Sequence, residues 1–128
     1  MKKILIDTNI YSHAFRGTED VIETLRKADE IGLTVISIGE LFAGFKGGGK
    51  EKENLEELEE FLDSPRVVVY NVDDQTSGFY ANVFHNLKKA GTPIPTNDIW
   101  IAAIAFQHGL TIFTKDIHFN HVAGLSFV

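Results

Sequence analysis

Four acidic residues are spread along the chain, and each stands where an apolar run ends or where a helix is expected to begin. They are Asp7, Glu40, Asp98 and Asp116. Carboxylate oxygens are ligands that Mg²⁺ and Mn²⁺ prefer in proteins, but such a hard cation needs several of them converging on one point. The chemistry that these residues suggest is therefore the binding of a divalent metal, provided that folding brings them together.

Three of the four acids follow short runs that are typical of buried β-strands. These runs are residues 4–6, 33–38 and 111–114. In sheets of parallel strands, the carboxyl ends of the strands meet at the crevice where ligands bind. Asp98 instead begins the apolar segment 99–106, which we expect to be a buried helix whose first turn faces the same crevice.

The other segments alternate between helical and strand patterns. We expect a helix over residues 19–31 with Gly32 as its stop, because Val21, Ile22, Leu25 and Ala28 recur at helical spacing. Further helices are expected from residue 8 to Gly17, from Glu40 to residue 45, around residues 55–62 and over 73–90, and further strands over 67–70 and 125–128. This alternation predicts an α/β protein of three layers, α/β/α, with a central, mainly parallel sheet of about five strands.

Composition limits the classes of protein that the chain can belong to. Its 128 residues suit a single domain spanning 1–128 with a substantial core. The absence of cysteine excludes disulfides and thiolate metal sites and fits a cytoplasmic protein. The longest apolar run is too short to span a membrane. The net charge of −6 argues against holding nucleic acid on a broad basic surface, but not against a nuclease whose acidic site binds metal.

Each acid also has a purely structural explanation. Glu40 completes the pattern Ser37-x-x-Glu40, which is typical of a helix capping box. Asp7 and Asp98 suit the beginnings of helices, where Asn97 is also expected to act as a cap, and Asp116 suits a turn. Four separate caps would not need to lie at one end of one sheet, so their joint pattern favours the metal site.

Four motifs that contain these acids resemble the PIN-domain family, and in particular the VapC-type toxin ribonucleases of toxin–antitoxin pairs. In chain order the motifs are residues 4–9, residues 37–41 with Gly44, residues 97–103, and residues 114–119 followed by Gly124 and Leu125. The resemblance covers essentially the whole chain. It implies a PIN-like fold and a metal-dependent endoribonuclease that uses Mg²⁺, with Mn²⁺ as a substitute, and leaves 5′-phosphate and 3′-hydroxyl ends.

The resemblance also assigns roles to residues. Asp7 and Asp98 are expected to be direct metal ligands, whereas Asp116 and Glu40 complete the catalytic site and help to orient the attacking water. Hydrogen bonds that hold these carboxylates in place are expected from four polar residues: Thr8, Asn9, Asn97 and Thr114. The partners implied are an RNA substrate, a VapB-like antitoxin and a second copy of the chain in a homodimer. The family resemblance gives no RNA sequence.

Three other functions remain to be weighed. A PIN-like subunit that has become a binding or regulatory protein would be expected to lack some of the acids, and here all four are present. A phosphoryl-accepting receiver domain or a haloacid-dehalogenase-like phosphatase would need a further acid close after Asp7, where Thr8 and Asn9 stand instead.

His118 and His121 have a spacing that suits a metal, but packing or surface placement is the favoured interpretation for both.

Overall fold

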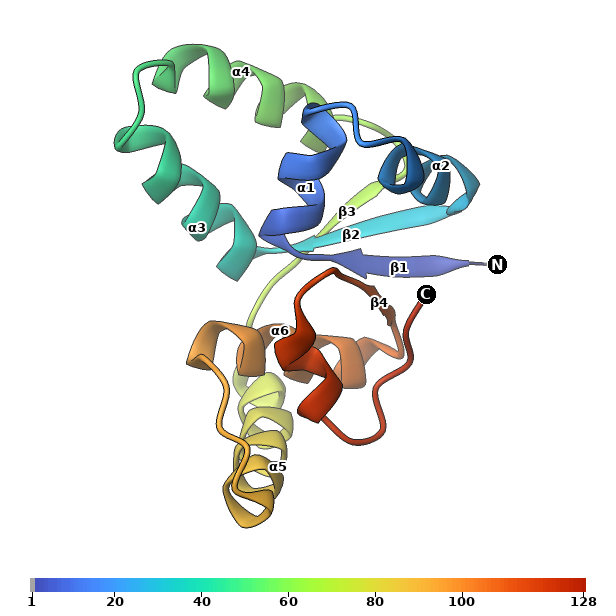
Figure 1. The fold of residues 1–128 in the computed structure, drawn as a ribbon, viewed down its shortest axis with the longest axis vertical. Coiled ribbons are helices and arrows are strands. Elements are labelled where there is room, and N and C mark those ends of the chain that lie inside the picture. The colour runs from blue at the N-terminus through green and yellow to red at the C-terminus, as the bar shows by residue number, and fades with distance from the viewer. Residues whose placement is uncertain (1) are drawn as a thin grey trace.

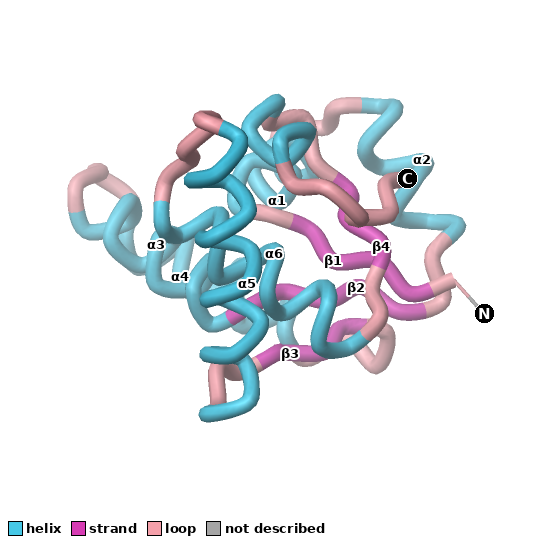
Figure 2. Tube along the Cα trace, turned by 90° about the horizontal axis from the view of Figure 1, so that it is seen from below, coloured by secondary structure: helices cyan, strands magenta, loops and turns pink. Residues whose placement is uncertain are grey.

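A four-stranded, fully parallel sheet in the order β3-β2-β1-β4 forms the centre of the computed structural model (Figure 1, Figure 2). The structure describes residues 2–128. In chain order the elements are β1 (Lys3–Ile6), α1 (Thr8–Phe15), α2 (Glu19–Lys27), β2 (Glu30–Thr34), α3 (Val35–Lys46), α4 (Glu51–Leu62), β3 (Val67–Tyr70), α5 (Asp74–Ala90), α6 (Thr96–His108), β4 (Thr111–Phe113) and the 3₁₀-helix η1 (Ile117–His121).

The central strand β1 contributes to two separate hydrophobic cores, because successive side chains of a strand point to opposite faces. Ile4 and Ile6 pack with apolar residues of α1, α2, α3 and α4. Leu5 packs on the other face with residues of α5, α6 and η1. All three side chains are fully buried. The predicted three-layer α/β/α arrangement is therefore confirmed, with α1 to α4 on one side of the sheet and α5 and α6 on the other (Figure 1).

The predicted end of the second helix is wrong, because α2 ends at Lys27 rather than at residue 31. Arg66, which lies far along the chain, closes this helix. Its Nη1 donates hydrogen bonds to three backbone oxygens at the end of α2, the shortest being 2.7 Å to the oxygen of Ala28. These bonds reach carbonyl oxygens at the end of the helix, where the regular backbone hydrogen bonds run out. Gly32 consequently lies inside β2, where it pairs with Leu5, and ends no helix.

The predicted strand over residues 33–38 is also misplaced, since β2 ends at Thr34 and α3 begins at the next residue. Thr34 is the N-cap of α3, and its Oγ1 accepts a hydrogen bond of 3.1 Å from the backbone nitrogen of Ser37. Ser37 therefore lies within the first turn of the helix rather than at its cap. The capping box predicted for Ser37 and Glu40 is wrong, which leaves the Glu40 carboxylate free for another role.

The C-terminal segment forms less of the sheet than predicted. Residues 125–128 contribute a single bridge between Phe127 and Ile112 instead of a fifth strand. The backbone of Ile112 donates to Ser126 and accepts from Val128, at 2.8 and 3.0 Å. No helix within residues 2–128 combines the length and the apolar character that crossing a membrane would require.

Two glycines provide a matched test of packing in this fold. A Cβ added at Gly32 would lie 2.8 Å from Cε2 of Tyr70, whose hydroxyl donates a 2.6 Å hydrogen bond to Glu30 and so restrains the ring. Gly78, on the exposed side of α5, has nothing within 4 Å of the same position. We expect Gly32→Ala to lower the free energy of unfolding by about 1–3 kcal/mol through overpacking. Gly78→Ala should raise it by about 0.5–1 kcal/mol through helix propensity.

Urea denaturation of both variants checks this pair. Equal effects of the two substitutions would contradict the close approach of Tyr70 to β2.

Candidate metal centre

Parallel pairing brings the carboxyl ends of β1, β2 and β4 to one edge of the sheet. Ile6, the last residue of β1, pairs with Leu33 on one side and Phe113 on the other. The residues that follow these three strands therefore emerge next to one another. The beginnings of α1, α3 and α6 and the segment from β4 to η1 lie near these strand ends, between the two helical layers (Figure 1).

Asp7 sits at the centre of this edge and is only 6% exposed. It is the N-cap of α1, and its Oδ1 accepts a 2.9 Å hydrogen bond from the backbone nitrogen of Ile10. Its other oxygen, Oδ2, accepts a hydrogen bond from the hydroxyl of Thr114. The same Thr114 oxygen accepts a 2.9 Å hydrogen bond from the backbone nitrogen of Asp116. Thr114 thus fixes Asp7 and Asp116 relative to each other.

Glu40 lies in the second turn of α3 and is held through both of its carboxylate oxygens. Thr8 donates from its hydroxyl to Oε1 at 2.8 Å, and Asn97 donates from its side-chain amide to Oε2 at 3.4 Å. Thr8 is the residue after Asp7, and Asn97 is the residue before Asp98. Glu40 therefore joins the segment that carries Asp7 to the segment that carries Asp98.

Asp98 and Asp116 approach each other around a histidine. Asp98 lies in the first turn of α6, and Asp116 is the N-cap of η1; their side chains are 14% and 22% exposed. Nδ1 of His118 lies 3.4 Å from Oδ2 of Asp98 and 3.2 Å from Oδ1 of Asp116. One ligand atom from each of these three residues falls within 4.8 Å of the other two. This spacing suits shared coordination of one cation.

These contacts join the four acids in a closed ring, in which neighbours are hydrogen-bonded, adjacent in the chain or, for Asp98 and Asp116, bridged by His118. It runs from Asp7 through Thr114 to Asp116, on to Asp98 beside His118, and back through Asn97, Glu40 and Thr8. The structure therefore gathers all four acids from four distant segments.

Burial and negative neighbours raise the pKa of two of the four carboxyl groups. Burial and then the charge of Asp116 raise the pKa of Asp98 to about 6, with a smaller contribution from Glu40, although His118 opposes the rise. Burial also raises the pKa of Asp7, against the hydrogen bond from Thr114. For both groups, burial raises the pKa more than repulsion between like charges does. A cation bound among these groups would favour their ionised forms.

Other sequence predictions at the site have mixed outcomes. The prediction that Asn97 caps α6 is wrong, because Pro95 occupies the N-cap and its backbone oxygen accepts from the nitrogens of Asp98 and Ile99. This leaves the Asn97 amide free to reach Glu40. Asn9 is exposed and takes no part in the ring.

His118 is the residue whose role sequence reasoning underestimated. It was assigned to packing or the surface, yet it lies between two of the carboxylates. Its position two residues after Asp116 was the signal that could have found it, since a tight turn at Asp116 folds its side chain back toward that carboxylate.

Comparisons with known proteins identify the family to which this chain belongs. Residues 4–125 match the model of the PIN-domain family, so the chain belongs to that family. Its relatives include VapC-type proteins. The chain is 31% identical over 87 residues to ribonuclease VapC4 of Mycobacterium tuberculosis, which covers 68% of this chain and 67% of that protein. It is 27% identical over 128 residues to ribonuclease VapC1 of Haemophilus influenzae. This match covers 96% of this chain and 94% of that protein.

Solved structures show the same fold. VapBC2 from Rickettsia felis, bound to a DNA fragment from its promoter, matches with a TM-score of 0.86 and 25% identity, covering 98% of this chain and 96% of that chain. FitAcB from Neisseria gonorrhoeae matches with a TM-score of 0.77 and 28% identity at the same coverage. The resemblance to VapC-type PIN domains is therefore confirmed.

The raised pKa of Asp98 makes a prediction about stability. Because the folded-state pKa of about 6 exceeds the ordinary value of 3.8, ionising Asp98 costs the folded state more than the unfolded chain. This group therefore stabilises the fold fully below about pH 4, and that stabilisation is lost as the pH rises toward 6. We expect metal-free Asp98→Asn to be more stable than the wild type at pH 7 by about 1–2 kcal/mol, with a smaller difference at pH 5.

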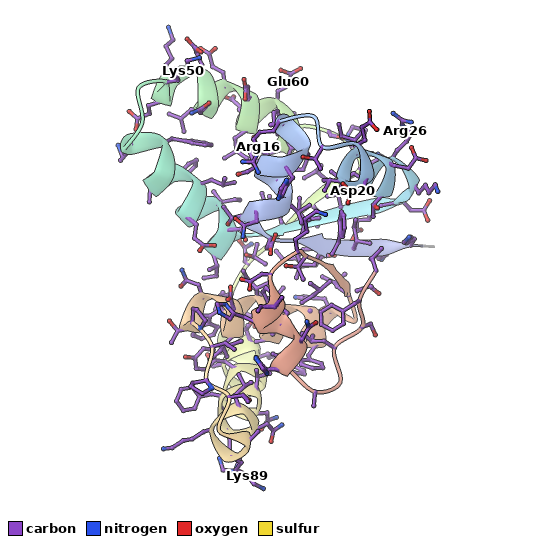
Figure 3. All side chains as sticks on the ribbon, viewed as in Figure 1. Arg16, Asp20, Arg26, Lys50, Glu60 and Lys89 are labelled. Atoms are coloured by element: carbon purple, nitrogen blue, oxygen red, sulfur yellow. The ribbon has the colours of Figure 1, made fainter. Side chains whose placement is uncertain are left out.

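Thermal or urea unfolding in the presence of a chelator checks this expectation. Glu60→Gln is the control, because Glu60 is exposed on α4, away from the beginnings of α1, α3 and α6 (Figure 3). A destabilising effect of Asp98→Asn at pH 7 would contradict the raised pKa of Asp98.

Proposed function

We propose that this chain is a metal-dependent endoribonuclease of the VapC type and the toxin of a toxin–antitoxin pair. The observation that carries the proposal is the ring of contacts that gathers Asp7, Glu40, Asp98 and Asp116 at the carboxyl edge of a PIN-domain sheet. Several relatives that cover most of the chain are named ribonuclease VapC. With RNA as the proposed substrate, we propose a cytoplasmic location.

The donor set suits a hard divalent cation, with Mg²⁺ as the proposed cofactor and Mn²⁺ able to replace it. A divalent cation supplies an activated water and neutralises charge that develops on phosphate oxygens. Asp7 and Asp98 would hold the cation directly, since both are largely buried and have raised pKa values that a positive charge would relieve. Asp116 would complete the ligand set, and Glu40 would orient the attacking water.

Hydrogen bonds around the carboxylates support this division of roles. Thr114 holds Oδ2 of Asp7 and the backbone of Asp116, so one hydroxyl sets the separation of two acids. Thr8 and Asn97 each hold one oxygen of Glu40, which prevents its carboxylate from rotating. Orientation of this kind is worth about 10-fold to 100-fold in metal affinity or activity at other metal sites.

Charge on the remaining surface also favours metal-dependent approach of RNA. Arg26, Lys50 and Lys89 project from α2, the start of α4 and the end of α5, in three separate parts of the molecule (Figure 3). Lys115, which lies beside Asp116, is paired with Asp20 at 2.8 Å. The protein has a net charge of −6, and these basic residues are dispersed over its surface. A phosphate group can therefore approach the four acids only when a bound cation neutralises them.

We propose further that a VapB-like antitoxin silences the chain and that the chain forms a homodimer. Similar solved structures are VapBC assemblies. An apolar groove between α3 and α4, lined by Phe42, Leu55 and Leu58, offers a surface for an antitoxin segment. Phe42 and Leu55 are 44% and 39% exposed and lie together in this groove, and contiguous exposed apolar side chains are typical of interaction sites.

RNA cleavage by the purified, antitoxin-free protein tests the function. A mixed RNA pool should be cut with Mg²⁺ or Mn²⁺ and not with a chelator, giving 5′-phosphate and 3′-hydroxyl ends. Asp7→Asn and Asp98→Asn should each lower the rate by about 100-fold or more, because each removes a charged ligand. Glu60→Gln should cleave like the wild type. Undiminished cleavage by both site variants would remove the assignment, and inactivity of folded wild type would favour a regulatory PIN-like subunit.

A second test concerns the hydroxyl that joins two of the acids. Thr114→Val removes the donor to Asp7 at nearly constant volume, so we expect about a 10-fold to 100-fold loss of cleavage with a folded protein. Thr114→Ser should retain most of the activity because it keeps the hydroxyl. Thr111→Val, at the other end of β4, is the matched control. Equal activity of Thr114→Val and Thr114→Ser would show that the hydroxyl is dispensable.

A further inference from the structure

His118 lies beside Asp98 and Asp116, on a segment that core packing and a backbone hydrogen bond hold in place. It is the second residue of η1, and its neighbour Phe119 is completely buried in the core formed with α5 and α6. The backbone nitrogen of His118 donates a 2.9 Å hydrogen bond to Oδ1 of Asp116. The imidazole itself is 46% exposed. The backbone of His118 is thus held in place while its ring can adjust over the site.

The distances around the ring suit coordination as well as hydrogen bonding. Donors at adjacent corners of an octahedral shell with bonds of about 2.1 Å lie about 3.0 Å apart. Nδ1 of His118 lies 3.2 Å from the Asp116 oxygen and 3.4 Å from the Asp98 oxygen. A small inward adjustment of these three donors would therefore accommodate one cation between them.

An imidazole changes the chemistry of a site that otherwise holds only carboxylates. Oxygen donors suit Mg²⁺, whereas a nitrogen donor favours transition-metal ions, whose affinities rise from Mn²⁺ to Co²⁺. We propose that His118 is a nitrogen ligand of this metal site and biases it toward Co²⁺ and Mn²⁺ over Mg²⁺. This inference rests on the proposed metal-dependent function and adds a determinant of metal selectivity to it.

The alternative role of His118 is to hydrogen-bond the two carboxylates without touching the metal. The two roles predict opposite effects of removing the ring. If the ring only competes with metal for Asp98 and Asp116, its loss should leave the binding of every cation unchanged or tighter. If Nδ1 is a ligand, its loss should weaken Co²⁺ and Mn²⁺ much more than Mg²⁺.

Isothermal titration calorimetry tests the proposal. The antitoxin-free protein is titrated with Mg²⁺, Mn²⁺ or Co²⁺ alone, in the absence of RNA. The variant is His118→Asn, which places a neutral amide near the position of Nδ1. We expect the preference for Co²⁺ over Mg²⁺ to fall by about 10-fold, mainly through weaker Co²⁺ binding, with a smaller fall for Mn²⁺. The visible absorption of bound Co²⁺ should also change on loss of a nitrogen ligand.

His121→Asn is the matched control, because His121 belongs to the same 3₁₀-helix and is exposed but is not part of the cluster. Its metal preference and Co²⁺ spectrum should equal those of the wild type. Circular dichroism should show that both variants fold, as expected for substitutions of exposed side chains. An unchanged ratio of Co²⁺ to Mg²⁺ affinity in His118→Asn, or tighter binding of all three ions, would overturn the proposal.

Failure of this inference is distinguishable from failure of the proposed function. If the wild type binds these metals and cleaves RNA while His118→Asn keeps the wild-type selectivity, only the role of His118 is lost. If the wild type binds none of the three ions and does not cleave RNA, the proposed function fails and the role of His118 fails with it.

Discussion

Parallel pairing of β1 between β2 and β4 is the constraint on which the rest of the site depends. The hydrogen-bonded register places Ile6 level with Leu33 and Phe113, so the segments that follow leave the sheet at one point. Because β1 is buried on both faces, any shift of this strand would disturb two cores at once. Asp7 therefore has a fixed position, and the other acids are placed relative to it.

Gathering the four carboxyl groups in a defined geometry makes it less favourable for some of them to ionise. Buried and closely spaced carboxyl groups favour their neutral forms, which the raised pKa values of Asp7 and Asp98 reflect. Neutral donors compensate in part, since Thr8, Asn97 and Thr114 each direct a hydrogen bond at a carboxylate oxygen. None of them supplies positive charge. A site arranged in this way has more to gain from a divalent cation than an exposed cluster of acids would.

One aspartate can both cap a helix and act as a metal ligand, because its carboxylate has two oxygens. Asp7 closes the first turn of α1 with Oδ1 and presents Oδ2 to Thr114. Asp116 caps η1 and approaches the ring of His118 through one oxygen, Oδ1, so that its Oδ2 takes part in neither contact. The helix-cap explanation drawn from the sequence was thus correct for Asp7, and the turn explanation for Asp116 agrees with its place before η1. For Glu40 the cap explanation was wrong, since Thr34 performs that task.

The sequence by itself determined the alternation of elements, the strongly apolar α6 and the positions of four acids near strand and helix ends. These features are local, because periodicity and apolar runs depend on neighbouring residues. Only the tertiary structure decided that α2 ends at Lys27, where Arg66 reaches it across the chain, and that His118 faces the acids. Such outcomes depend on hydrogen bonds between segments that lie far apart in sequence. No local pattern of residues encodes those contacts, so the completed site was visible only after the chain had folded.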